Sequence, residues 1–158
     1  MKAVSVSQIK KELNHLSSDE LTELCLRLAK FKQENKELLT YLLFESHDEA
    51  GYIETVKAEV DEQFDLINTN SYFYIKKSVR KILRLIKKFA RYSLKKETEV
   101  ELLLYFCYKL KTFEPSIFKN VTLTNIYQRQ LQSIKKIVAT LHEDLQYDYR
   151  LKLEEIEN

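Results

Sequence analysis

Apolar residues recur along this chain at intervals of three and four positions, which is the spacing of one face of an α-helix. The pattern predicts an all-α fold of six or seven helices, packed as antiparallel pairs in a bundle or a short α-solenoid. Residues 18–32 and the segment from residue 34 onward are separated by a weak break, so they could form one helix or two. Residues 122–157 could likewise be one helix or two, divided near His142.

Polar residues at the segment boundaries predict where the helices begin. Ser17 followed by Glu20 is a capping box, in which each residue's side chain binds the backbone N–H of the other. Short polar side chains are also preferred at the residue before a helix. The other expected caps are Ser46 or Asp48, Ser71, and Thr122 or Thr124.

Glycine and proline each occur once in 158 residues. Sheet proteins need both residue types in tight turns, so their scarcity supports helices rather than strands. The length fits one domain, and we expect residues 1–158 to form a single domain. The longest apolar run, residues 102–108, is much shorter than the roughly 20 residues that span a bilayer. We therefore expect a cytoplasmic protein with no membrane partner.

The strongest local signal is a basic segment over residues 71–96, which carries ten Lys or Arg and no Asp or Glu. On a helix that advances about 100° per residue, its apolar side chains lie on one side and its cations on the other. The predicted contact residues, all within one arc of about 140°, are Lys77, Arg80, Arg84, Lys88 and Arg91.

Three partners would suit this basic face: a nucleic-acid backbone, an anionic membrane surface, or a groove on another protein. The membrane is the weakest of the three, because the core needs the apolar side of the same helix. Tyr72, Tyr74 and Tyr92 flank the cations and could stack on unpaired bases. The alternative is a solvated face that is neutralised by residues 45–66, whose net charge is −7.

The short loop between the acidic and basic segments predicts that they form an antiparallel hairpin. Counting outward from that loop places Glu62 beside Lys76 and Lys77, and Glu59 beside Arg80. We expect ion pairs of this kind at the flanks of the two helices, while the middle of the basic arc stays in solvent.

No pattern for catalysis or cofactor binding accompanies the basic face. Glu12 and His15 have the spacing of half a di-iron site, but the second Glu-x-x-His that such a site needs is missing. His142 lies beside carboxylates near a helix break, where we expect a solvated cluster. Cys25 and Cys107 lie in apolar runs and predict two reduced thiols in the core. We expect no metal, no cofactor and no enzymatic activity.

Two stretches carry a likeness to known proteins: LSSDELTELCLRLAKFKQENKELLTYLL, and KKSVRKILRLIKKF followed by ELLLYF. They resemble an uncharacterised family of small all-helical bacterial proteins, known as a domain of unknown function. The resemblance covers most of the chain. It implies an all-helical fold and a bacterial cytoplasmic setting, and it implies no particular activity, ligand or catalytic residue.

These patterns favour a non-catalytic helical binding or scaffold protein with a protein partner. The alternative is a nucleic-acid-binding protein that uses the basic helix over residues 71–96. A positive surface strip that is unbroken by carboxylates would favour the nucleic-acid hypothesis.

Overall fold

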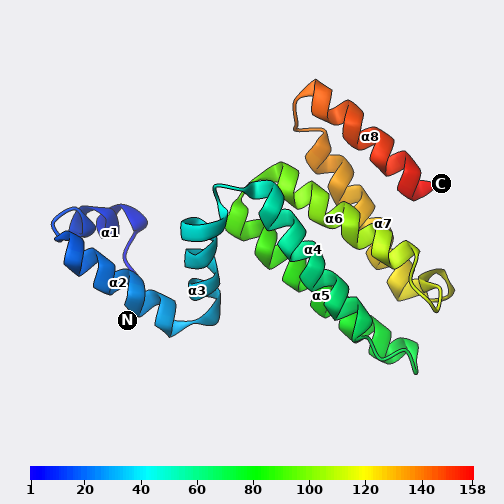
Figure 1. Ribbon diagram of the computed structural model, residues 1–158, viewed down its shortest axis with the longest axis horizontal. Helices are drawn as coiled ribbons and strands as arrows, with labels where there is room; N and C mark the ends of the chain where they lie inside the picture. The colour runs from blue at the N-terminus through cyan, green and yellow to red at the C-terminus, as the bar shows by residue number, and fades with distance from the viewer. The chain divides into compact units, whose positions relative to one another are not determined.

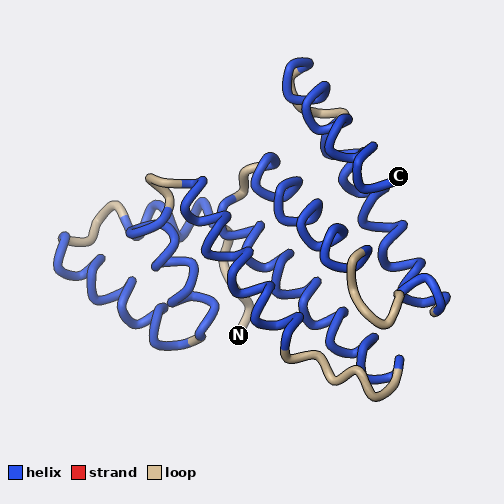
Figure 2. The backbone as a smooth tube through the Cα atoms, turned by 45° about the vertical axis from the view of Figure 1, so that its right-hand side comes forward, coloured by secondary structure: helices blue, strands red, loops and turns tan.

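The computed structural model describes residues 1–158 and contains helices but no strands (Figures 1 and 2). The all-α prediction is confirmed, whereas the predicted count of six or seven helices is too low, because there are eight α-helices. Both segments that could have been single helices are divided. Lys32, with an extended backbone, divides the first, and a turn before His142 divides the second.

Contacts divide the chain into two compact units, Met1–Phe44 and Glu45–Asn158, which are described separately. The single domain over residues 1–158 stays a prediction. The helices of the first unit are α1 (Val6–Leu13), α2 (Ser18–Phe31) and α3 (Gln33–Thr40), and a π-helical turn at Tyr41–Glu45 follows α3. The capping box of Ser17 and Glu20 is present at the start of α2, as predicted.

The first unit has almost no buried core, and Tyr41 is its one buried side chain. Leu28 and Phe31 belong to the apolar stripe of α2, yet they are 59% and 77% exposed. Cys25 on the same helix is exposed, so the prediction that it is a core thiol is wrong. A side chain is buried only where another element covers it, and the short helix α3 covers only part of α2.

The second unit contains α4 (Glu49–Asp65), α5 (Tyr72–Ser93), α6 (Lys96–Lys111), a 3₁₀ turn (Ile117–Lys119), α7 (Val121–Val138) and α8 (Glu143–Glu157). Its central helix is α6, which contacts α4, α5, α7 and α8 (Figure 1). A helix that four others contact must be apolar over most of its circumference, and Leu103, Phe106 and Cys107 of α6 are all buried. Cys107 is therefore the core thiol that was predicted, and burial raises its pKa to about 12.

Helices α4 and α5 contact each other, as the hairpin prediction requires (Figure 1). Burying apolar side chains on both helices is the main stabilising contribution to such a contact. Those buried side chains are Val56, Val60, Phe64, Ile75, Val79 and Ile82. A separate hydrogen bond fixes the start of α5 to the segment after α6: the Tyr72 hydroxyl donates to the backbone oxygen of Ser116 at 2.9 Å.

The last two helices begin at polar caps. Asn120 caps α7, in place of the predicted Thr122 or Thr124: its Oδ1 accepts a hydrogen bond at 3.1 Å from the backbone N–H three residues on. The Thr124 hydroxyl donates instead to the backbone oxygen of Asn120 at 2.9 Å. At the start of α8, His142 Nδ1 accepts from the backbone N–H two residues on, at 3.3 Å. His142 is therefore a helix cap at the predicted break.

Candidate functional site

The first candidate site is a strip of exposed cations along α5, which we name the basic strip. It consists of Lys77, Arg80, Lys81, Arg84, Lys87 and Arg91. Four of the five predicted contact residues belong to it. The fifth, Lys88, is half-buried, and its Nζ lies 5.1 Å from the ring centroid of Phe89.

The basic strip has no carboxylate partner on the neighbouring acidic helix. Glu59 and Glu62 are exposed, and no ion pair joins either of them to α5. The predicted pairs of Glu59 with Arg80, and of Glu62 with Lys76 or Lys77, are therefore wrong. Both helices turn their apolar stripes toward the core, so their charged faces point to solvent instead of toward each other.

The paired carboxylates of α4 bind other parts of the second unit. Asp61 Oδ1 accepts a hydrogen bond from the Tyr105 hydroxyl at 2.7 Å, and Lys109 Nζ lies 2.9 Å from the same oxygen. Glu54 pairs with Lys57, one turn further along α4, at 2.9 Å. These carboxylates of α4 therefore pair with cations on α6 and on α4 itself. None of them neutralises the positive charge of the basic strip.

The basic strip ends at a pair of exposed aromatic side chains. Phe73 is 67% exposed and Tyr74 is 46% exposed. Their ring centroids are 5.5 Å apart in an edge-to-face arrangement. Of the three predicted tyrosines, only Tyr74 is exposed, since Tyr72 and Tyr92 are half-buried. Sequence reasoning missed Phe73, although its position three residues before Lys76 puts it on the cationic side of the helix.

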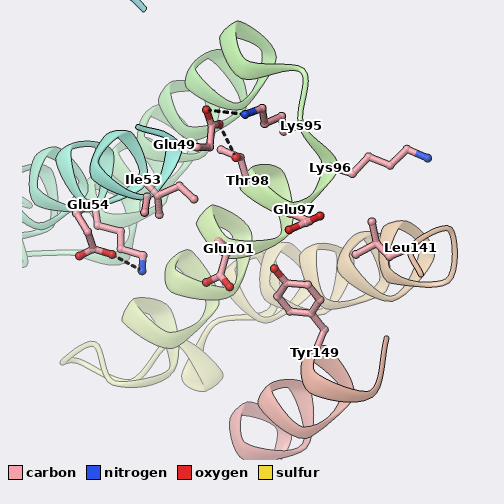
Figure 3. Close-up of a pocket in the computed structure, with 12 residues that line it drawn as sticks. Glu49, Ile53, Glu54, Lys95, Lys96, Glu97, Thr98, Glu101, Leu141 and Tyr149 are labelled. Carbon is pink, nitrogen blue, oxygen red and sulfur yellow. Dashed lines mark hydrogen bonds and ion pairs between the residues drawn. The ribbon is translucent and has the colours of Figure 1, made fainter. Parts of the chain in front are cut away.

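The second candidate site is an open cavity of about 870 Å³ formed by residues of α4, α6 and α8, the 94–95 linker and Leu141. Figure 3 shows its wall of Glu49, Thr98 and Lys95, and the ring of Tyr149 across from Glu101. Its apolar surface comes from Ala50, Ile53 and Leu141.

Several polar groups of this cavity already have partners within the protein. Glu49 Oε1 accepts hydrogen bonds from the hydroxyl of Ser93 and from that of Thr98, the latter at 2.6 Å, and its Oε2 lies 3.6 Å from Lys95 Nζ. Glu101 is 2.8 Å from Lys152 Nζ. A ligand would have to displace these contacts, so the cavity is a weaker candidate than the basic strip.

Tyr149 lines the same cavity. Burial raises the pKa of its hydroxyl, and the nearby charges of Glu101, Glu97 and Asp148 raise it further. The phenol therefore loses its proton even less readily than an ordinary tyrosine, whose pKa is about 10, and it does not serve as a base at neutral pH.

Glu12 and His15 have the spacing of half a di-iron site. Glu12 and His15 are both exposed. Nowhere in residues 1–158 do three or more His, Cys, Asp or Glu side chains come together in a group that could hold a metal ion.

Comparison of the chain with protein-family models, with curated proteins and with solved structures finds no match. The resemblance to an uncharacterised bacterial family therefore stays a prediction. None of the helices combines the length and the apolar character that crossing a membrane requires.

Proposed function

We propose that this protein is a non-catalytic helical binding protein, and that its binding surface is the basic strip on α5. One observation carries the proposal: six cations lie exposed on one helix face, and none of them is paired with a carboxylate. Unpaired surface cations keep their full attraction for an anionic partner. The cytoplasm is our proposed location.

The best-supported ligand is a nucleic-acid backbone. Phosphates repeat along a strand at short intervals, and a row of Lys and Arg that neutralises them releases condensed counterions. Residues 77 to 91 cover about 21 Å at 1.5 Å per residue, which is long enough for several phosphates. A membrane surface is less well supported. A helix binds there by inserting its apolar side, whereas Ile75, Val79 and Ile86 of α5 have 0% exposure.

We also infer that the second unit is a short α-solenoid. Helix α4 contacts α6, and α6 contacts α8, so alternate helices form one row. Stacked helix pairs of this kind present extended surfaces to their partners.

Fluorescence anisotropy with labelled RNA and DNA oligonucleotides tests the ligand. We expect binding at low salt that weakens steeply as salt rises, with a log–log slope of up to about −4 on a single strand if all six cations contact phosphates. The double variant Arg80→Gln/Arg84→Gln should weaken binding and make the slope shallower. The matched control is Arg129→Gln/Lys136→Gln, which removes the same charge from exposed positions on α7.

Two results would overturn the nucleic-acid ligand. One is no binding to any RNA or DNA at low salt. The other is equal loss of binding in the α5 and α7 variants, since that would reflect net charge rather than the basic strip. Polyglutamate binding with the same dependence on Arg80 and Arg84, in place of oligonucleotide binding, would identify an acidic protein segment as the partner.

A further inference from the structure

We propose that the basic strip receives an unpaired nucleic-acid strand, and that Phe73 and Tyr74 form a platform on which its bases stack. This inference rests on the proposed function and deepens it. It specifies single-stranded RNA or DNA as the ligand class and assigns a binding role to two aromatic residues.

The first argument is alignment along the helix. Positions four, seven, eleven and eighteen residues apart fall on nearly the same face of an α-helix. Counted from Phe73, these positions are Lys77, Arg80, Arg84 and Arg91. Eighteen residues make five full turns, so Phe73 and Arg91 lie in one line about 27 Å apart. The aromatic pair is therefore one end of the basic strip rather than a separate surface.

The second argument is exposure. The neighbouring aromatic, Tyr72, is half-buried and anchored by its hydroxyl to the backbone of Ser116. Phe73 is 67% exposed and has no polar atom for water to bind. Its contact in the structure is the edge-to-face packing with Tyr74, which restrains the ring and leaves much of its surface open. A restrained, open aromatic face beside cations is the arrangement that stacks on bases.

The third argument is the difference between paired and unpaired strands. In a duplex the base faces are stacked on each other and cannot reach a surface aromatic side chain. In an unpaired strand the bases can turn toward Phe73 while the phosphates stay on the cations of α5. The arginines of the strip can stack as well as pair with phosphate, because the guanidinium group is planar. The basic strip with its aromatic platform therefore binds unpaired strands in preference to duplexes, and it does not select a base sequence.

The test compares a single-stranded RNA, a single-stranded DNA and a duplex of equal length by fluorescence anisotropy. Phe73→Ala should weaken binding to both single strands by about 5- to 150-fold, the loss of one stacked base. It should change duplex binding by less than about twofold, because phosphate contacts dominate there. Tyr147→Ala on α8 is the matched control, since Tyr147 is also a largely exposed aromatic, at 64%. Circular dichroism verifies that each variant keeps its helices.

Phe73→Trp supplies a readout other than affinity. The chain has no tryptophan, so the introduced indole would be its one tryptophan fluorophore. Stacking on a base should quench this emission, and a duplex should leave it unchanged. Quenching by both single strands supports the inference for RNA and for DNA. Quenching by only one of them identifies that nucleic acid, RNA or DNA, as the ligand.

The outcomes separate this inference from the proposed function. If the chain binds neither single strands nor duplex, both fail together. If single strands bind no better than duplex, and Phe73→Ala binds as the unchanged chain does, only the stacking platform fails. Binding without quenching of the Phe73→Trp variant also overturns the platform.

Discussion

The hydroxyl of Tyr105 on α6 donates a hydrogen bond to Asp61 Oδ1 on α4 at 2.7 Å. Lys109 Nζ lies 2.9 Å from the same oxygen. Partial burial alone would raise the pKa of Asp61, but the hydrogen bonds from Tyr105 and Lys109 and the charge of Lys109 bring it below its usual value. Burial raises the pKa of Tyr105, and the hydrogen bond to Asp61 raises it further. This carboxylate therefore stabilises the contact of α4 with α6.

The lowered pKa of Asp61 predicts a dependence of stability on pH. Its contribution is fully present above the unfolded-state pKa, about 3.9, and is lost as the pH falls through the lower folded-state pKa. Asp61→Asn should therefore reduce the free energy of unfolding at pH 7 and have little effect near pH 2. The side chain of Asp61 is 41% exposed, so the loss should be about 0.2–1 kcal/mol.

Urea unfolding of the Asp61→Asn chain at the two pH values checks this. Asp65→Asn is the control, because Asp65 is an exposed carboxylate on the same helix. Equal destabilisation by Asp61→Asn at both pH values would show that its charge does not matter.

A second prediction concerns Glu49, whose carboxylate joins the start of α4 to the hydroxyls of Ser93 and Thr98. Glu49→Ala should lower the free energy of unfolding by about 1–3 kcal/mol, because it leaves buried hydroxyl groups without their acceptor. Thr98→Val should cost less, since it removes one donor and keeps the volume of the side chain. Glu54→Ala, at a side chain that is 72% exposed, should cost less than about 0.5 kcal/mol. A Thr98→Val loss larger than that of Glu49→Ala would contradict this account.

A third prediction concerns the core at α6. Leu104 is buried, with 5% exposure. Leu104→Ala should lower the free energy of unfolding by about 2–5 kcal/mol, through lost burial and the cavity that remains. Leu66→Ala is the control, at a leucine that is 77% exposed, and should stay within about 0.5 kcal/mol. Denaturant unfolding measures the change in unfolding free energy of both variants, and the m-value should stay unchanged. A change near zero for Leu104→Ala would place the Leu104 side chain outside the core.

A fourth prediction concerns the end of α5. Leu94 follows the helix with a φ of 58°, in the left-handed region that disfavours residues with a Cβ. Its side chain is 85% exposed, so little packing would be lost on replacement. Leu94→Gly should raise the free energy of unfolding by about 1 kcal/mol, because glycine adopts this conformation freely. Leu94→Ala keeps the Cβ and should bring no such gain. A thermal melt in which the glycine variant is the less stable of the two would refute the argument.

Much of the helical structure could be read from short stretches of sequence. The apolar spacing of α5 and the capping box of Ser17 and Glu20 depend on residues within one or two turns, and both are present in the structure. The sequence also indicated the break near His142, as one of two alternatives for residues 122–157. The boundary at Lys32 was harder to predict, because no glycine or proline marks it and its side chain makes no capping hydrogen bond.

Short stretches of sequence could not predict which side chains are buried or which charged side chains form ion pairs. Cys25 and Cys107 lie in similar apolar runs, yet the first is exposed and the second is enclosed by the helices around α6. Glu59 and Asp61 are two residues apart on one acidic helix, yet only Asp61 has a partner, on α6.

The separation of cations from apolar residues on α5 follows from the helical repeat, which is a local property that the residues encode directly. Whether those cations are neutralised depends on how α4 is rotated about its axis, and that rotation is set by the packing of Val56, Val60 and Phe64 against neighbouring helices. The apolar contacts of α4 outweigh exposed ion pairs of about 0.2–1 kcal/mol each. Packing therefore directs Asp61 toward α6 and leaves the basic strip of α5 without a carboxylate partner.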